Sequence, residues 1–129
     1  MERHAILVVD DDKTILSIIS DWLIKDGFRV YPAQNTTEAV EHCRLHREEI
    51  RLAVIDVKLE YESGFDLADL LEKEYGLTHV VFITAFFWDK DTNEELLRRG
   101  KPYFEKPIKF KRELLPFLHK YFAEGVKEG

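Results

Sequence analysis

The sequence is poor in cysteine, and its one cysteine, Cys43, has no partner for an internal disulfide. This excludes a disulfide-stabilised scaffold and agrees with a reducing compartment, so we expect a cytoplasmic protein. The chain also has no excess of positive charge, since 19 basic and 25 acidic residues give a net charge of -6. Without a basic patch, direct binding to nucleic acid or to an anionic membrane surface is not expected.

Long hydrophobic runs are absent as well, and no stretch approaches the roughly 18 apolar residues that a membrane-spanning helix needs. The segment that begins at Met1 lacks the small-residue cleavage site of a secretory signal peptide. Internal repeats and low-complexity segments are also missing. The chain has 129 residues, of which 45% are hydrophobic and 34% charged, as is typical of one globular domain. We assign this domain to residues 1–122 and expect a polar tail at 123–129.

The apolar residues are concentrated in short continuous runs, a pattern typical of strands buried on both faces of a parallel sheet. Two of these runs, at 5–9 and 52–55, lead directly into carboxylates. The patterns predict further strands at 28–33, 79–84 and 103–105, helices at 13–26, 36–47, 65–75 and 91–99, and a last helix whose apolar face includes Leu114, Leu118 and Phe122. This alternation predicts an α/β fold with a five-stranded parallel sheet and helices on both faces.

The sequence makes a more specific prediction for the first helix and for the last. Ile18 and Trp22 belong to a set of apolar residues at helical spacing, so we expect this face of the first helix to lie in the core. Pro116 lies within the last helix and predicts a kink there, unless the helix begins near Glu113.

Polar side chains follow four of the predicted strands. They are Asp10, Asp11 and Asp12 after the first strand, Asp56 at the end of the third, Thr84 at the end of the fourth and Lys106 after the fifth. Because parallel strands place their carboxyl ends at one edge of a sheet, we expect these side chains to converge. A lone aspartate in such a place more often caps a turn, but that explanation does not cover the whole set.

Three adjacent carboxylates repel one another and therefore need an explanation. Asp12 is placed to cap the first helix, but a cap needs only one carboxylate. A divalent cation would relieve the repulsion between Asp10 and Asp11, and hard oxygen ligands suit Mg²⁺. With Asp56 as a nucleophile, and with a threonine hydroxyl and a lysine ammonium to hold phosphoryl oxygens, the set suits phosphoryl transfer through an acyl phosphate.

Together these motifs resemble the receiver domain of two-component response regulators, of the chemotaxis-regulator type. The resemblance covers about residues 4–122 and rests on Ile6–Asp12, Asp56 with Gly64, Thr84–Ala85 and Lys106–Pro107, in that order. It implies a flavodoxin-like fold with strand order 2-1-3-4-5. It also implies that Asp56 takes phosphate from a sensor histidine kinase or a histidine phosphotransfer protein, and that the domain catalyses only its own phosphorylation and dephosphorylation.

The resemblance implies a role for each matching residue. Mg²⁺ would be held by Asp10, Asp11, Asp56 and the backbone carbonyl of Lys58. The phosphoryl group would be contacted by Asp56, Thr84 and Lys106. The conformational switch would involve Thr84 and Tyr103. The surface of the fourth helix, fifth strand and fifth helix would carry the output. A homodimer formed on phosphorylation is one outcome that the resemblance allows. Separately from the resemblance, Pro107 fixes the local backbone and permits a cis peptide bond after Lys106.

Some positions depart from the family pattern. Glu60 stands where a proline is often found, and the segment Gly100–Tyr103 is one residue shorter than the common form, which affects the placement of Tyr103. Lys58 and Phe86 occupy two variable positions that influence how long the phosphate survives. A bulky Phe86 would shield the acyl phosphate from water.

Two other functions are compatible with parts of the sequence. The run Asp10–Thr14 fits the D-x-D-x-T pattern of haloacid dehalogenase-like phosphatases, in which Asp10 would be the nucleophile, but this leaves Asp56 without a role. A degenerate receiver would serve only as an interaction module. The aromatic run Phe86, Phe87 and Trp88 is hard to bury in a small domain and predicts a partner surface.

Overall fold

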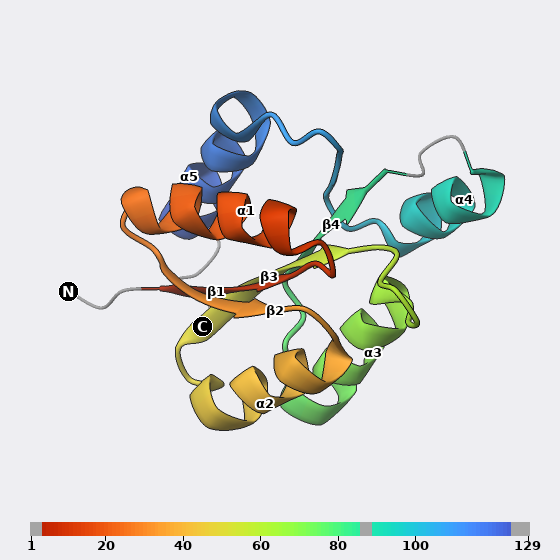
Figure 1. Ribbon diagram of the computed structural model, residues 1–129, viewed down its shortest axis with the longest axis horizontal. Helices are drawn as coiled ribbons and strands as arrows, with labels where there is room; N and C mark the ends of the chain where they lie inside the picture. The colour runs from red at the N-terminus through yellow and green to blue at the C-terminus, as the bar shows by residue number, and fades with distance from the viewer. Residues whose placement is uncertain (1–3, 86–88, 125–129) are drawn as a thin grey trace.

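Five parallel strands form the sheet of the computed structural model, which describes residues 4–85 and 89–124. The strand order β2-β1-β3-β4-β5 confirms the flavodoxin-like α/β fold (Figure 1). The elements are β1 (Ala5–Val9), α1 (Lys13–Lys25), β2 (Arg29–Ala33), α2 (Thr36–His46), β3 (Ile50–Asp56), α3 (Gly64–Tyr75), β4 (Val80–Thr84), α4 (Lys90–Arg99), β5 (Tyr103–Glu105), the π-helical turn η1 (Phe110–Leu114) and α5 (Leu115–Glu124). Their boundaries lie close to those expected from the sequence.

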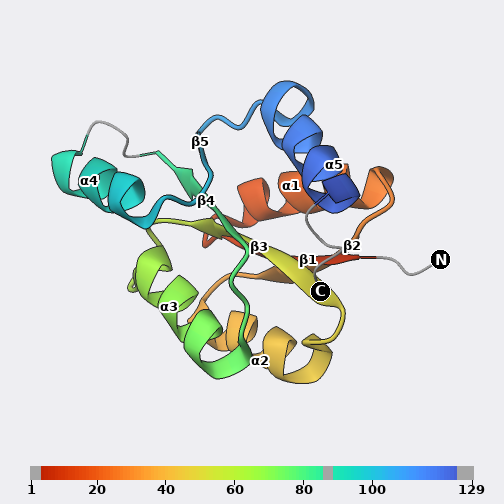
Figure 2. The same cartoon turned by 180° about the vertical axis from the view of Figure 1, so that it is seen from behind.

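The sheet divides the apolar core into two layers, because successive residues of a strand point to opposite faces. Leu7 and Phe82 belong to the layer beneath α2 and α3, whereas Ile6 and Ile83 belong to the layer beneath α1 and α5. Figures 1 and 2 show these helix pairs on opposite faces, with α4 beyond them at one end of the molecule. All residues of β1 and β4 are buried, which explains their continuous apolar runs.

The face of α1 that packs on the sheet differs from the expected one. Leu16, Ile19 and Leu23 are buried, whereas Trp22 is 37% exposed. The prediction that Trp22 lies in the core is therefore wrong, because the sheet-facing positions follow the repeat of Leu16, Ile19 and Leu23 instead. The Trp22 ring packs at the surface against Phe110 of η1, with 4.8 Å between ring centroids.

Pro116 does not interrupt a regular helix, since α5 begins one residue before it at Leu115. The preceding turn η1 is wider than an α-helical turn, and the N–H of Leu115 donates to the carbonyl of Phe110. The irregularity expected at the proline is thus a π-helical turn on its N-terminal side. Because α5 ends at Glu124, the start of the expected polar tail is helical, and 125–129 lie outside the described residues.

The outer strand β2 contains Pro32, which pairs in register with Val8 of β1. Proline has no amide N–H and is therefore confined to edge strands and bulges. The Pro32 carbonyl accepts a hydrogen bond from His42 Nε2 at 2.7 Å. The neighbouring Tyr31 ring stacks on His46 with 4.2 Å between centroids, so these contacts attach α2 to the edge strand.

Candidate functional site

The carboxyl ends of four strands bring the predicted site residues to one edge of the sheet. Asp56 and Thr84 are the last residues of β3 and β4, and Asp10 and Lys106 directly follow β1 and β5. The backbone N–H of Lys106 donates to the Thr84 carbonyl at 2.9 Å, which joins two of these ends. Asp10, Asp56 and Thr84 are only 2%, 4% and 0% exposed, so the site is set into the end of the sheet.

The Lys106 ammonium lies between two buried carboxylates. Its Nζ is 2.7 Å from Asp56 Oδ2 and 3.0 Å from Asp10 Oδ2. Burial by itself would lower the pKa of Lys106, but the hydrogen bonds and charges of Asp56 and Asp10 raise that pKa above its usual value. Lys106 therefore stays protonated and partly neutralises the acidic site. The Lys106–Pro107 peptide bond is cis, as the sequence suggested.

Asp10, Asp11 and Asp56 form a compact group of carboxylates. One oxygen atom from each lies within 4.8 Å of the other two, and Asp11 is exposed, so the group is open to solvent on that side. Burial, together with the charge of Asp56, raises the pKa of Asp10 to about 6. An added positive charge would thus be favourable here, and carboxylate oxygens are the ligands that Mg²⁺ prefers. The donor set fits Mg²⁺.

Backbone amides orient two of these carboxylates. The N–H of Asp12 donates to Asp10 Oδ1 at 2.9 Å, and the N–H of Lys58 donates to Asp56 Oδ1 at 3.1 Å. Lys58 forms an isolated antiparallel bridge with Ser63, which closes the loop between β3 and α3. Each carboxylate therefore keeps a fixed orientation relative to its strand end.

Asp12 is the N-cap of α1, as expected, and its Oδ1 accepts from the amides of Thr14 and Ile15 at 2.9 and 3.1 Å. We expect Asp12→Ala to lower the free energy of unfolding by about 1 kcal/mol, and Asp12→Asn to remain near wild type, because asparagine also caps helices. Urea denaturation in EDTA measures this difference. The Kd for Mg²⁺, measured in a parallel titration, should differ from wild type by less than about threefold, since exposed charges are screened. Loss of Mg²⁺ binding in Asp12→Ala would instead make Asp12 a ligand.

Gly64 starts α3 directly against the end of β3. Its N–H donates to the Val57 carbonyl at 2.7 Å. A Cβ on Gly64 would lie 2.0 Å from the backbone oxygen of Asp56. The adjacent Ser63 caps the helix, with its Oγ accepting from the N–H of Phe65 at 3.1 Å. A side chain at this position would therefore obstruct the turn.

The remaining predicted residues lie at the periphery or outside the described chain. Tyr103 is the first residue of β5 and is 38% exposed, so its ring is not buried. The shorter connection before it is accommodated, because Gly100 ends α4 with a φ of 66° and β5 begins where expected. Phe86, Phe87 and Trp88 lie outside the described residues, and their role as a partner surface stays a prediction.

The family model for the response regulator receiver domain matches residues 6–116, which include every strand end of the site. The chain belongs to this family. The domain is 32% identical over 109 residues to the transcriptional regulatory protein YvrH of Bacillus subtilis, across 84% of this chain and 45% of YvrH. It is 29% identical to the polar-differentiation response regulator DivK of Brucella anthropi, across 84% of this chain and 88% of DivK. The chain spans about half the length of the first curated relatives it matches.

A solved structure also resembles this receiver domain over its full length. The CheY-like receiver domain protein from Methanospirillum hungatei has a TM-score of 0.83 and 27% sequence identity, with 99% of this chain and 100% of that chain covered. The protein is thus a receiver domain of two-component signalling. Within residues 4–85 and 89–124, no helix combines the length and the apolar content that crossing a membrane requires.

Sequence reasoning missed several contacts that shape the site. It did not find the amide donors of Asp12 and Lys58, because a backbone donor leaves no mark on residue type. It also missed Glu62, whose Oε1 accepts from the N–H of Thr36 at 2.9 Å and ties the β3–α3 loop to the start of α2. The two residues are 26 positions apart, so no local pattern could have linked them.

Proposed function

We propose that this receiver domain accepts a phosphoryl group on Asp56 from the phosphohistidine of a sensor histidine kinase or a histidine phosphotransfer protein. The observation that carries the proposal is the Lys106 ammonium between the buried carboxylates of Asp56 and Asp10. A fixed cation beside a carboxylate nucleophile is placed to hold phosphoryl oxygens while the P–N bond of the donor breaks and a P–O bond to Asp56 forms.

The contacts of Asp56 support its role as acceptor. Its two oxygens accept from the Lys58 amide and the Lys106 ammonium, so the carboxylate is oriented at the open end of β3. Thr84, at the end of the neighbouring strand β4, would donate its hydroxyl to a phosphoryl oxygen. Tyr103 would then turn inward and change the surface formed by α4, β5 and α5, to which the output partner binds.

Mg²⁺ is the proposed cofactor, and Asp10, Asp11, Asp56 and the carbonyl of Lys58 would hold it. When bound, the ion neutralises charge on the phosphoryl oxygens. Asp10 keeps the Lys106 ammonium in place through their 3.0 Å contact. The exposed Asp11 adds a further negative charge on the open side of the site.

The proposed role applies to the whole domain, residues 1–122. We propose that it catalyses only its own phosphorylation and dephosphorylation, acts in the cytoplasm, and forms a homodimer if phosphorylation favours one. The family match spans Asp10 to Lys106 and favours this function over a phosphatase with Asp10 as nucleophile. A degenerate receiver is disfavoured, because the acids, Thr84 and Lys106 are all present at one edge of the sheet.

The test is phosphorylation by acetyl phosphate with Mg²⁺, followed by mass spectrometry of the intact protein. We expect an adduct of about 80 Da on the wild type and at least about 100-fold less on Asp56→Asn, because the amide is not a nucleophile. Asp66→Asn is the control, since it removes an exposed carboxylate of α3 and should behave as wild type. An adduct that persists in Asp56→Asn but disappears in Asp10→Asn would support the phosphatase, and no adduct on any variant would contradict the proposal.

A further inference from the structure

Among residues 4–85 and 89–124, few apolar contacts hold α4 to the rest of the domain. Among its residues, all of which are described, Leu96 alone is buried, while the next residue, Leu97, is 71% exposed. The helix α1, in contrast, buries four residues. Figures 1 and 2 show α4 beyond the helix layers that cover the sheet. Its position therefore depends strongly on polar contacts.

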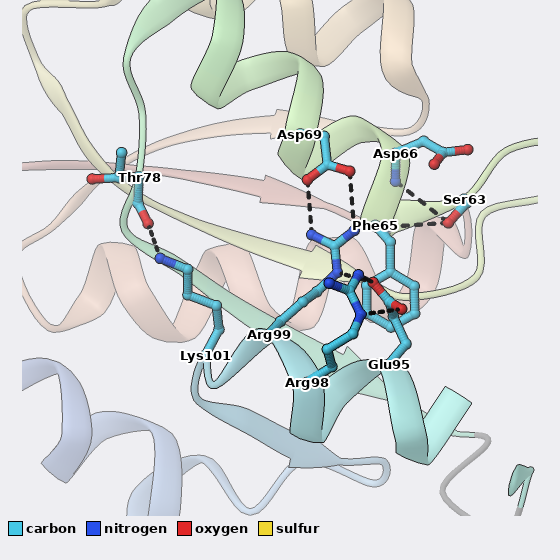
Figure 3. Close-up of polar contacts among 9 residues, drawn as sticks. All are labelled: Ser63, Phe65, Asp66, Asp69, Thr78, Glu95, Arg98, Arg99 and Lys101. Carbon is cyan, nitrogen blue, oxygen red and sulfur yellow. Dashed lines mark hydrogen bonds and ion pairs between the residues drawn. The ribbon is translucent and has the colours of Figure 1, made fainter. Parts of the chain in front are cut away.

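The main polar contact between α4 and α3 is made by Arg99. Its Nη1 and Nη2 donate to Asp69 Oδ1 and Oδ2 at 2.9 and 3.0 Å, and its Nε donates to Glu95 of the same helix. The guanidinium also lies over the Phe65 ring, 4.9 Å from its centroid (Figure 3). The Arg99 side chain is only 15% exposed, whereas the Asp69 side chain is 61% exposed, so the guanidinium is shielded from water and the carboxylate lies at the surface. The hydrogen bonds from Arg99 lower the pKa of Asp69, because they stabilise its ionised form.

These contacts lie at one end of α4. Arg99 is its last residue, and just beyond it Lys101 Nζ donates to the Thr78 carbonyl at 2.8 Å (Figure 3). At the other end, the N-cap Asp89 bonds to Thr92 within α4. The C-terminal end of α4 is thus fastened to α3 and to the segment before β4.

We propose that Arg99 is a latch: its ion pair with Asp69 holds α4 in the position described here, and this pair has to open when phosphorylation moves α4. This inference rests on the proposed function, in which phosphorylation of Asp56 changes the surface that includes α4. Any contact made only in the unphosphorylated state opposes phosphorylation. By thermodynamic reciprocity, a weaker latch must strengthen the binding of a phosphoryl group, or of its analogue, at Asp56.

The test is a titration with beryllofluoride, a phosphoryl analogue, in the presence of Mg²⁺, followed by calorimetry. We expect Arg99→Ala to bind it about three- to tenfold more tightly than the wild type, although Arg99 is not one of the residues proposed to hold the phosphoryl group or Mg²⁺. Asp69→Asn should shift the affinity in the same direction and leaves the Arg99 side chain intact. Arg98→Ala is the matched control, because Arg98 pairs with the same Glu95 but is 68% exposed and should stay within about twofold of wild type.

The outcomes separate the latch from a merely structural contact. A destabilised domain would bind the analogue less tightly or equally, so unchanged or weaker binding by both Arg99→Ala and Asp69→Asn overturns the inference. An equal gain in Arg98→Ala also overturns it, because that gain would follow from charge alone. If neither the wild type nor any of these variants binds beryllofluoride, the proposed function is wrong and the latch is wrong with it.

Discussion

Gly64→Ala is expected to lower the free energy of unfolding by at least about 3 kcal/mol and to abolish phosphorylation of Asp56. The added Cβ would lie 2.0 Å from the Asp56 oxygen and 2.9 Å from its carbonyl carbon, both of which are backbone atoms. The residues around this carbonyl in β3 are buried, so the strand has no room to retreat. The start of α3 must therefore move away and lose the hydrogen bond from Gly64 to Val57.

Gly76→Ala provides the control for this prediction. Gly76 ends α3 with a φ of 67°, and apart from its own chain neighbours no atom of the described residues lies within 4 Å of the place that a Cβ would occupy, so a methyl group there meets only backbone strain. We expect Gly76→Ala to lower the free energy of unfolding by about 1 kcal/mol and to leave phosphorylation of Asp56 unchanged. Urea denaturation and the acetyl phosphate reaction measure both properties. If Gly64→Ala lowers the free energy of unfolding by no more than Gly76→Ala, the backbone around Asp56 can move to accept the added methyl group, and the prediction is wrong.

Asp10→Asn is expected to stabilise the protein in EDTA at pH 8 by about 2 to 3 kcal/mol, while it abolishes stabilisation by Mg²⁺. The pKa of Asp10 is raised from 3.8 to about 6 in the folded protein. Between these values the folded state holds a proton that the unfolded state has released. The wild type therefore loses stability as the pH rises through about 6, whereas a variant with a neutral asparagine side chain at this position does not.

The pH dependence and a second variant distinguish burial from metal binding. The stability difference between wild type and Asp10→Asn in EDTA should grow from pH 4 to pH 8. Asp11→Asn should also lose the effect of Mg²⁺, but it should change stability in EDTA by less than about 0.5 kcal/mol, because Asp11 is exposed. A wild type that is more stable than Asp10→Asn at pH 8 in EDTA would contradict the prediction.

The fold could be predicted from the sequence because a parallel sheet leaves a strong pattern. Strands β1 and β4 are buried on both faces, so each is a continuous apolar run. The face of α1 was harder to identify, because Ile18 and Trp22 are as apolar as the buried Leu16 and Leu23. The repeat of Leu16, Ile19 and Leu23 faces the sheet, which leaves Trp22 near the surface, where its ring packs on Phe110 from a distant part of the chain.

The convergence of the site residues could also be predicted from the sequence. Parallel topology alone brings Asp10, Asp56 and Lys106 to one edge, and the structure brings them into direct contact. The pairing of Arg99 with Asp69 could not be predicted, because the two residues are 30 positions apart and both are of types common on helix surfaces. Such a contact depends on how α3 and α4 are placed in space, which no local pattern encodes.

The edge strand β2 has a consequence for self-association. An outer strand can recruit a strand from another molecule through its unpaired amides and carbonyls, and this is a common route to aggregation. Pro32 brings no amide to that edge, and its carbonyl is already bonded to His42. This strand is therefore a poor template for edge-to-edge growth of the sheet, which lowers the tendency of the domain to aggregate through this edge.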